Sequence, residues 1–251
     1  NESYVLWQWL LGDSATTGST TSPAGSLAST SIVADAGHFS VMTYTGSGAN
    51  ATVGHGLGAA PTMVLIKNLE TAENWLAWHE GLTSAQYFLN LNTTGAEFDN
   101  GSSGYFRGTA PNATVITMND SSYNTSSRDY IAYCFKSVAG VCKVGTYEGN
   151  NNANGTYVNL GFTPAFFMAK NIDATGSWFI IDNKRGFNSA SNEAYLQAES
   201  TATETVGNVA DLLSDGVKWR TTGGGNASNT FIYIAMADIG GNGTLPPVYG
   251  K

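Results

Sequence analysis

The chain has 251 residues and a formal net charge of −8, because 19 Asp and Glu outnumber 11 Lys and Arg. No basic stripe is present to neutralise phosphates, so nucleic-acid binding is not expected. The longest apolar runs, 5–11 and 165–169, are far shorter than the ~20 residues that span a bilayer, which argues against membrane insertion.

The N-terminal segment 4–9 predicts a strand rich in aromatic residues, and its sequence is like that of the strand predicted below to close each of two repeats. A strand edge with unpaired N–H and C=O groups invites pairing with another chain. We therefore expect Tyr4, Trp7 and Trp9 to lie in an interface or in a strand between repeats. The Ser-, Thr- and Gly-rich stretch 12–31 that follows is predicted to be a loop or linker.

Short runs of alternating or continuous apolar residues, separated by Gly, Asn and Ser, predict strands along the rest of the chain. In the first half they cover 39–44, 62–68 after Pro61, 74–79, 87–91, 114–118 and 129–135, with a glycine-interrupted hairpin region at 98–107. In the second half they cover 144–147, 157–160, 165–170, 178–182, 194–197, 217–220 and 230–237. One short helix is expected at 208–213.

The second half repeats the first at a constant spacing of 103 residues, the separation of Pro61 and Pro164 (164 − 61). The same spacing joins several other pairs of identical residues: Tyr44 and Tyr147, Lys67 and Lys170, Asn68 and Asn171, Trp75 and Trp178, and Tyr130 and Tyr233. One spacing held over separated blocks indicates an internal duplication.

We therefore predict an all-β fold of two tandem β-sandwich units, each with about seven short strands. A jelly-roll-like and an immunoglobulin-like topology fit equally well, because the sequence does not order the strands. The predicted parts are an incoming strand and linker over 1–36, a first sandwich over 37–138, and a second over 139–251 that includes a short C-terminal tail.

No constellation of catalytic, cofactor-binding or metal-binding residues is recognised. Neither cysteine, Cys134 or Cys142, has a cysteine at the matching position of the other repeat, so two buried free thiols are favoured over a local disulfide. The three histidines do not recur and lack the helical spacing of a zinc site. The carboxylates are scattered, and a calcium ion in a loop stays open as an alternative.

Aromatic residues offer the only candidates for ligand contact. Trp75 and Trp178 occupy one repeat position and are expected in the core. Tyr105, Phe106 and Trp219 lie beside glycine-rich loops. Core packing is favoured for these three as well, with stacking on a sugar as the alternative.

Several motifs resemble an uncharacterised duplicated domain of tailed-bacteriophage virion proteins, found in tail fibres and other appendages, especially of marine phages. They are Phe-Ser-Val-Met-Thr-Tyr-Thr-Gly at 39–46, Val-Gly-His-Gly-Leu-Gly at 53–58, Tyr-Ile-Ala-Tyr-Cys-Phe at 130–135, and Val-Gly-Thr-Tyr-Glu-Gly at 144–149. Leu-Gly-Phe-Thr-Pro at 160–164 and Tyr-Ile-Ala at 233–235 continue the likeness, which covers about 37–238. The family has no established catalytic residues, so the resemblance implies a place in the virion and no activity.

The resemblance implies a tail-fibre or appendage segment that displays loops for attachment to the host surface. The implied partners are other virion proteins, further copies of the same chain with a trimer favoured, and a host cell-surface glycan. Such a protein is assembled in the bacterial cytoplasm and exposed on the particle. The alternatives are a capsid-decorating or tail-scaffold protein without receptor binding, and an appendage that cleaves polysaccharide.

Overall fold

The computed structural model describes residues 20–22, 24–120, 122–185 and 194–238. The all-β prediction is confirmed, since the described chain forms antiparallel sheets and only two short 3-10 helices, η1 (Ser122–Asn124) and η2 (Gly224–Asn226). The predicted strand 4–9, with Tyr4, Trp7 and Trp9, lies outside the described residues.

The first half forms an eight-stranded sheet in the order β1-β2-β3-β10-β5-β6-β7-β8, here called the first sheet. Its strands are β1 (Thr20–Ser22), β2 (Ser29–Val33), β3 (Phe39–Thr45), β5 (Met63–Asn68), β6 (Leu76–His79), β7 (Tyr87–Asn90), β8 (Phe98–Asp99) and β10 (Asp129–Phe135). A separate pair, β4 (Ala51–Gly54) with β9 (Val115–Met118), contributes to the same core.

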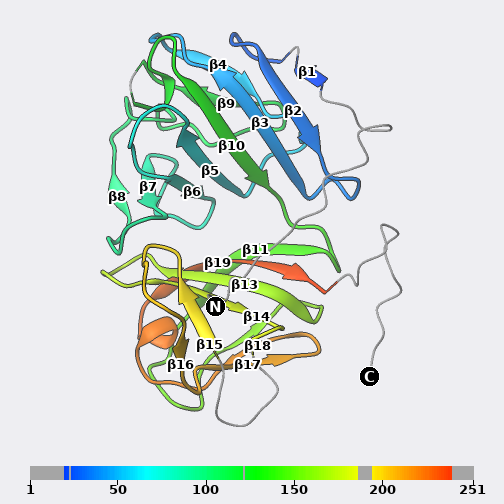
Figure 1. The fold of residues 1–251 in the computed structure, drawn as a ribbon, viewed down its shortest axis with the longest axis vertical. Coiled ribbons are helices and arrows are strands. Elements are labelled where there is room, and N and C mark those ends of the chain that lie inside the picture. The colour runs from blue at the N-terminus through cyan, green and yellow to red at the C-terminus, as the bar shows by residue number, and fades with distance from the viewer. Residues whose placement is uncertain (1–19, 23, 121, 186–193, 239–251) are drawn as a thin grey trace.

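The second half forms a six-stranded sheet in the order β11-β19-β13-β14-β15-β16, here called the second sheet. Its strands are β11 (Cys142–Glu148), β13 (Pro164–Asn171), β14 (Trp178–Asp182), β15 (Ala194–Gln197), β16 (Thr205–Val206) and β19 (Thr230–Ala237). A three-stranded sheet of β12 (Tyr157–Asn159), β18 (Gly216–Trp219) and β17 (Ala210–Leu213) lies beside it. Figure 1 shows the first half above the second.

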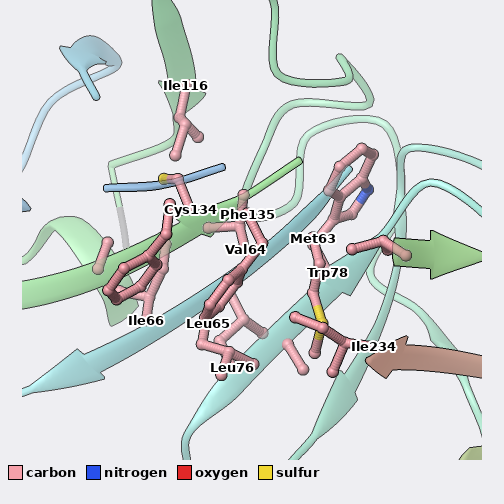
Figure 2. Packing of buried hydrophobic residues seen from close by; sticks show 14 of the residues in the cluster. Met63, Val64, Leu65, Ile66, Leu76, Trp78, Ile116, Cys134, Phe135 and Ile234 are labelled. Carbon is pink, nitrogen blue, oxygen red and sulfur yellow. The ribbon is translucent and has the colours of Figure 1, made fainter. Parts of the chain in front are cut away.

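The two large sheets pack against each other by one face, which we call the inner face of each. Side chains alternate between the faces of a strand, and β19 shows where each face lies. Its Phe231 and Tyr233 belong to a cluster with Trp219 of β18, on the outer face. Its Ile232 and Ile234 belong to the cluster that includes the first sheet, on the inner face. Figure 2 shows Ile234 close to Met63 of β5.

The predicted strands agree closely with the observed ones in the core of each half. The predictions for 129–135, 178–182, 194–197 and 230–237 match β10, β14, β15 and β19 at both ends. Both cysteines are buried free thiols, as favoured. Burial in apolar surroundings raises the pKa of Cys134 and of Cys142 to about 12, so both stay protonated at neutral pH.

Three of the secondary-structure predictions are wrong. The stretch 98–107 is not a hairpin, because β8 is the only strand within it and β8 pairs with β7. The stretch 208–213 is not a helix, because Ala210–Leu213 forms β17 and turns back through Ser214 and Asp215 to pair with β18. The stretch 12–31 is not wholly a loop, since it contains β1 and the start of β2. Small hydroxyl residues suit β2 because the hydroxyl of the buried Ser29 donates a hydrogen bond to the Gly54 carbonyl at 2.5 Å.

Candidate functional site

Two of the three aromatic residues considered for ligand contact are unavailable to any ligand at the surface. Phe106 and Trp219 are fully buried, which corrects the alternative that their rings stack on a sugar. The neighbouring glycine explains the case of Trp219, because a Cβ on Gly225 would collide with the Trp219 ring. Tyr105 is half-buried, with its ring edge-on to Tyr123 at a centroid distance of 4.9 Å.

A buried asparagine holds the exposed loops together at one end of each half. In the second half, the Asn226 Nδ2 donates to the carbonyls of Asn152 at 2.9 Å and Thr221 at 2.8 Å. Its Oδ1 accepts the backbone N–H groups of Asn150 and Thr156, each at 3.2 Å. These bonds fix the exposed loop 150–154 against η2.

The first half contains the same arrangement around Asn124. The Asn124 Nδ2 donates to the carbonyls of Ala49 at 2.6 Å and Asn119 at 2.7 Å. Its Oδ1 accepts the Ser47 N–H at 2.9 Å. Ser47 and Ala49 precede Asn150 and Asn152 by 103 residues (150 − 47, 152 − 49), so equivalent loop positions are bonded in each half.

These two asparagines do not fit the repeat pattern in the sequence because their spacing is 102 (226 − 124) and not 103. A search that allowed one inserted residue before the last strand would align Asn-Thr-Ser at 124–126 with Asn-Ala-Ser at 226–228. Both motifs sit in chain regions rich in Asn and Ser, where a single asparagine carries little signal.

The pair Asn68 and Asn171, which the sequence did identify, ends β5 and β13 in one and the same way. The Asn68 Oδ1 accepts the N–H groups of Glu70 and Thr71 at 2.9 and 3.1 Å. The Asn171 Oδ1 accepts those of Asp173 and Ala174 at 3.0 and 3.1 Å. An Asn side chain that bonds the backbone two residues on forms a turn, so both strands stop at the asparagine.

The inner face is covered very differently in the two sheets. In the second sheet, seven inner-face residues are buried: Val144, Lys170, Ile172, Trp178, Ile232, Ile234 and Met236. Their counterparts 103 residues earlier are only half-buried or exposed: Val41, Lys67, Leu69, Trp75, Asp129, Ile131 and Tyr133. We call these seven residues, together with the exposed Thr43 and Thr45, the open face.

The open face contains a hollow of about 350 Å³ where β2, β3 and β10 meet the residue after β5. Leu69, Thr45 and Asp129 line it, and the Thr45 hydroxyl donates to the Asp129 carboxylate at 2.7 Å. The lining offers hydroxyl groups, one carboxylate and an apolar side chain.

Lys170 in the second sheet is the counterpart of Lys67 on the open face, and it is completely enclosed. Its side chain is fully buried, and the Nζ donates to the carbonyls of Asn171 at 2.8 Å and Thr94 at 3.4 Å. Burial lowers the pKa of Lys170 to about 8, an effect that the nearby Glu199 carboxylate partly offsets. The carbonyl of Thr94 belongs to the first half, so this lysine bonds across the boundary between the halves.

His79 also lies at the boundary between the halves and is buried there. Its Nδ1 accepts the Gly81 N–H at 2.8 Å, so the neutral ring carries its proton on Nε2, which faces the Tyr233 carbonyl of the second half at 3.4 Å. Burial lowers the pKa of His79 from 6.5 to about 4, with the bond to Tyr233 acting in the opposite direction.

We expect His79 to make the chain less stable as the pH falls from 6.5 to about 4. In that window the unfolded chain binds a proton at His79 that the folded chain does not, and the difference amounts to about 3 kcal/mol. Denaturant titrations of wild type and His79→Gln at several pH values measure it, and the variant should lose that part of the slope. Equal slopes in the two proteins would contradict the buried neutral state of His79.

Among the residues that the structure describes, no group of three or more His, Cys, Asp or Glu side chains could hold a metal ion. Within the same residues, no helix is long and apolar enough to cross a membrane.

Comparison with known proteins places the chain in one family. No curated protein and no solved structure matches it. A family model described as a domain of unknown function, DUF7483, matches residues 1–239. Since the match covers nearly the whole chain, the protein belongs to the DUF7483 family.

Proposed function

We propose that the protein is a structural component of a tailed-phage virion, a tail-fibre or appendage segment that displays loops for attachment to the host surface. The motifs that resemble phage appendage proteins cover about 37–238 and supply the virion part of the proposal. The observation that carries the display part is the pair of buried asparagines, Asn124 and Asn226, which hold exposed polar loops in fixed positions.

The proposal includes an internal duplication, with one β-sandwich unit over 37–138 and a second over 139–251. The order β3-β10-β5-β6-β7 in the first sheet corresponds to β11-β19-β13-β14-β15 in the second. Hydrogen bonds support it as well, because the hydroxyl groups of Tyr44 and Tyr147 each donate at 2.6 Å to a carbonyl at the same place, that of Tyr123 in η1 and that of Gly225 in η2.

The display loops are polar and mostly uncharged, which suits contact with a host glycan more than with a charged partner. The loop 150–154 is exposed and has the sequence Asn-Asn-Asn-Ala-Asn before Gly155. Amide side chains can both donate and accept hydrogen bonds, as sugar hydroxyls require. The half-buried Tyr105 is the remaining aromatic candidate among the three considered.

Immunogold electron microscopy of particles from a phage that encodes this chain tests the proposal. Antibodies raised against the recombinant chain should label the tail fibres or another appendage, and pre-immune serum provides the control. Labelling spread over the capsid surface would favour a decorating protein without receptor binding. Absence of label, together with absence of the chain from purified particles by mass spectrometry, would contradict a virion role.

A further inference from the structure

The inner face of the second sheet is buried around Lys170 and Trp178 because a segment of the first half lies over it there. This segment, 90–97, begins at the last residue of β7 and is called here the cover segment. The Trp178 Nε1 donates to the Asn90 carbonyl at 3.1 Å, and the Glu97 N–H donates to the Ile172 carbonyl at 3.0 Å. The Thr94 carbonyl accepts from Lys170 at 3.4 Å and from the Gly176 N–H at 2.9 Å.

The second half contains its own counterpart of the cover segment. Asn90 of β7 pairs with Leu76, and Gln197 of β15 pairs with Phe179, which is 103 residues after Leu76 (179 − 76). Gln197 therefore occupies the position in the second half that Asn90 occupies in the first. The spacing between these equivalent positions is 107 residues (197 − 90). The pairs that β8 and β16 form keep this spacing of 107 residues. Tyr87 pairs with Asp99 in the first half. Ala194 pairs with Val206 in the second half, 107 residues later at both positions (194 − 87, 206 − 99).

This second cover segment, 197–206, leaves most of its residues in solvent. Residues 200–206 are all exposed, and Val206 is 56% exposed. Within the described part of the chain there is thus one inner face without a cover, around Leu69, and one cover segment without a face. Leu69 is also 56% exposed, and among the described residues only Tyr157, at 39%, is a further exposed large hydrophobic side chain.

We propose that the open face around Leu69 binds the 197–206 segment of a second copy of this chain. The contact would repeat between chains the packing that the cover segment 90–97 makes within one chain. The open face is continuous with that existing interface, since Met63 and His79 on the same side of the first sheet are already buried there. Figure 1 places the start of β10 in the upper part of the molecule and β16 in the lower part, so the two surfaces cannot meet within a chain.

The proposed contact joins two different surfaces, which makes it heterologous. Such an interface closes into a ring where the rotation between copies allows it, and otherwise extends into a filament. A ring of three copies would be the trimer that the resemblance to fibre proteins favours. The inference rests on the proposed duplication, because the duplication identifies 197–206 as the equivalent of 90–97.

Two charged variants and their mixture test the proposal by sedimentation velocity across a protein concentration series. Leu69→Arg places a charge on the open face, and Val206→Arg places one on the second cover segment. Each substitution should therefore lower the association constant by about tenfold or more relative to the wild type. An equimolar mixture should form dimers and nothing larger, because Val206→Arg still has an intact face and Leu69→Arg an intact cover. Tyr157→Arg, at the third exposed hydrophobic residue, should associate as the wild type does.

Three results would overturn the proposal: a wild type that stays monomeric at the highest concentration, variants that associate like the wild type, or a mixture that forms no dimers. Each variant changes an exposed side chain, and a far-ultraviolet circular dichroism spectrum checks that it folds. The outcome is independent of the immunogold result, since self-association of the purified chain can fail in a protein that is found on the virion, and can succeed in one that is not.

Discussion

Replacing Trp178 with alanine should lower the free energy of unfolding by about 3–5 kcal/mol, the range for truncating a buried tryptophan. The indole is almost completely buried between the halves. Its Nε1 also donates to the Asn90 carbonyl at 3.1 Å, so truncation leaves that acceptor without its partner. Equilibrium denaturation in urea measures the loss.

Trp75, which lies 103 residues before Trp178 (178 − 75) in the first half, is the matched control. It is only half-buried, on the open face, with its ring 6.1 Å from that of Tyr133. Because less of its surface is removed from water, Trp75→Ala in dilute, monomeric protein should cost about half as much as Trp178→Ala or less. Equal losses for the two variants would contradict the difference in cover between the two inner faces.

Replacing Asn226 with alanine should lower the free energy of unfolding by about 2–4 kcal/mol, since the change removes several hydrogen bonds that each contribute about 0.5–1.5 kcal/mol. The carbonyls of Asn152 and Thr221 lose their donor, and the N–H groups of Asn150 and Thr156 lose their acceptor. Asn124→Ala should have an effect of similar size, because Asn124 makes the equivalent bonds. Thermal and urea denaturation of both variants measure the effect.

An exposed asparagine of the same loop provides the comparison for Asn226. The Asn154 side chain lies in solvent, so Asn154→Ala should change the free energy of unfolding by no more than about 0.5 kcal/mol. A cost for Asn226→Ala that is no larger than this would show that the loop is held by something other than the asparagine. Hydrogen exchange of the 150–154 amides in Asn226→Ala should then also stay as slow as in the wild type.

The strands that the sequence predicts best are those whose residues are apolar on both faces or alternate strictly. The strand 230–237 is an example, because its side chains enter two cores in turn. The strands β1 and β2 were missed since Ser and Thr dominate them, and their place in the sheet depends on pairing with β3. The helix expected at 208–213 was wrong because pairing with β18 outweighs the local helix preference of its leucines.

The open face could not be predicted from the sequence, although the repeat spacing identifies all of its residues. Leu69 and Ile172 each follow a Lys-Asn pair and are both apolar, yet one is exposed and the other buried. The difference arises from the packing of one half of the chain on the other, which no local pattern encodes. The glycines beside Trp219 left an exposed ring open as the alternative to core packing, and in the fold Gly225 makes room for that ring in the core.

Electron cryomicroscopy of intact particles from a phage that encodes this chain would test most directly whether it is a self-associating virion component. Density for the chain is expected in a tail appendage, with the 197–206 segment of one copy lying over Leu69 and Trp75 of the next. Particles that lack the chain, or copies in the particle whose open face is left in solvent, would contradict it.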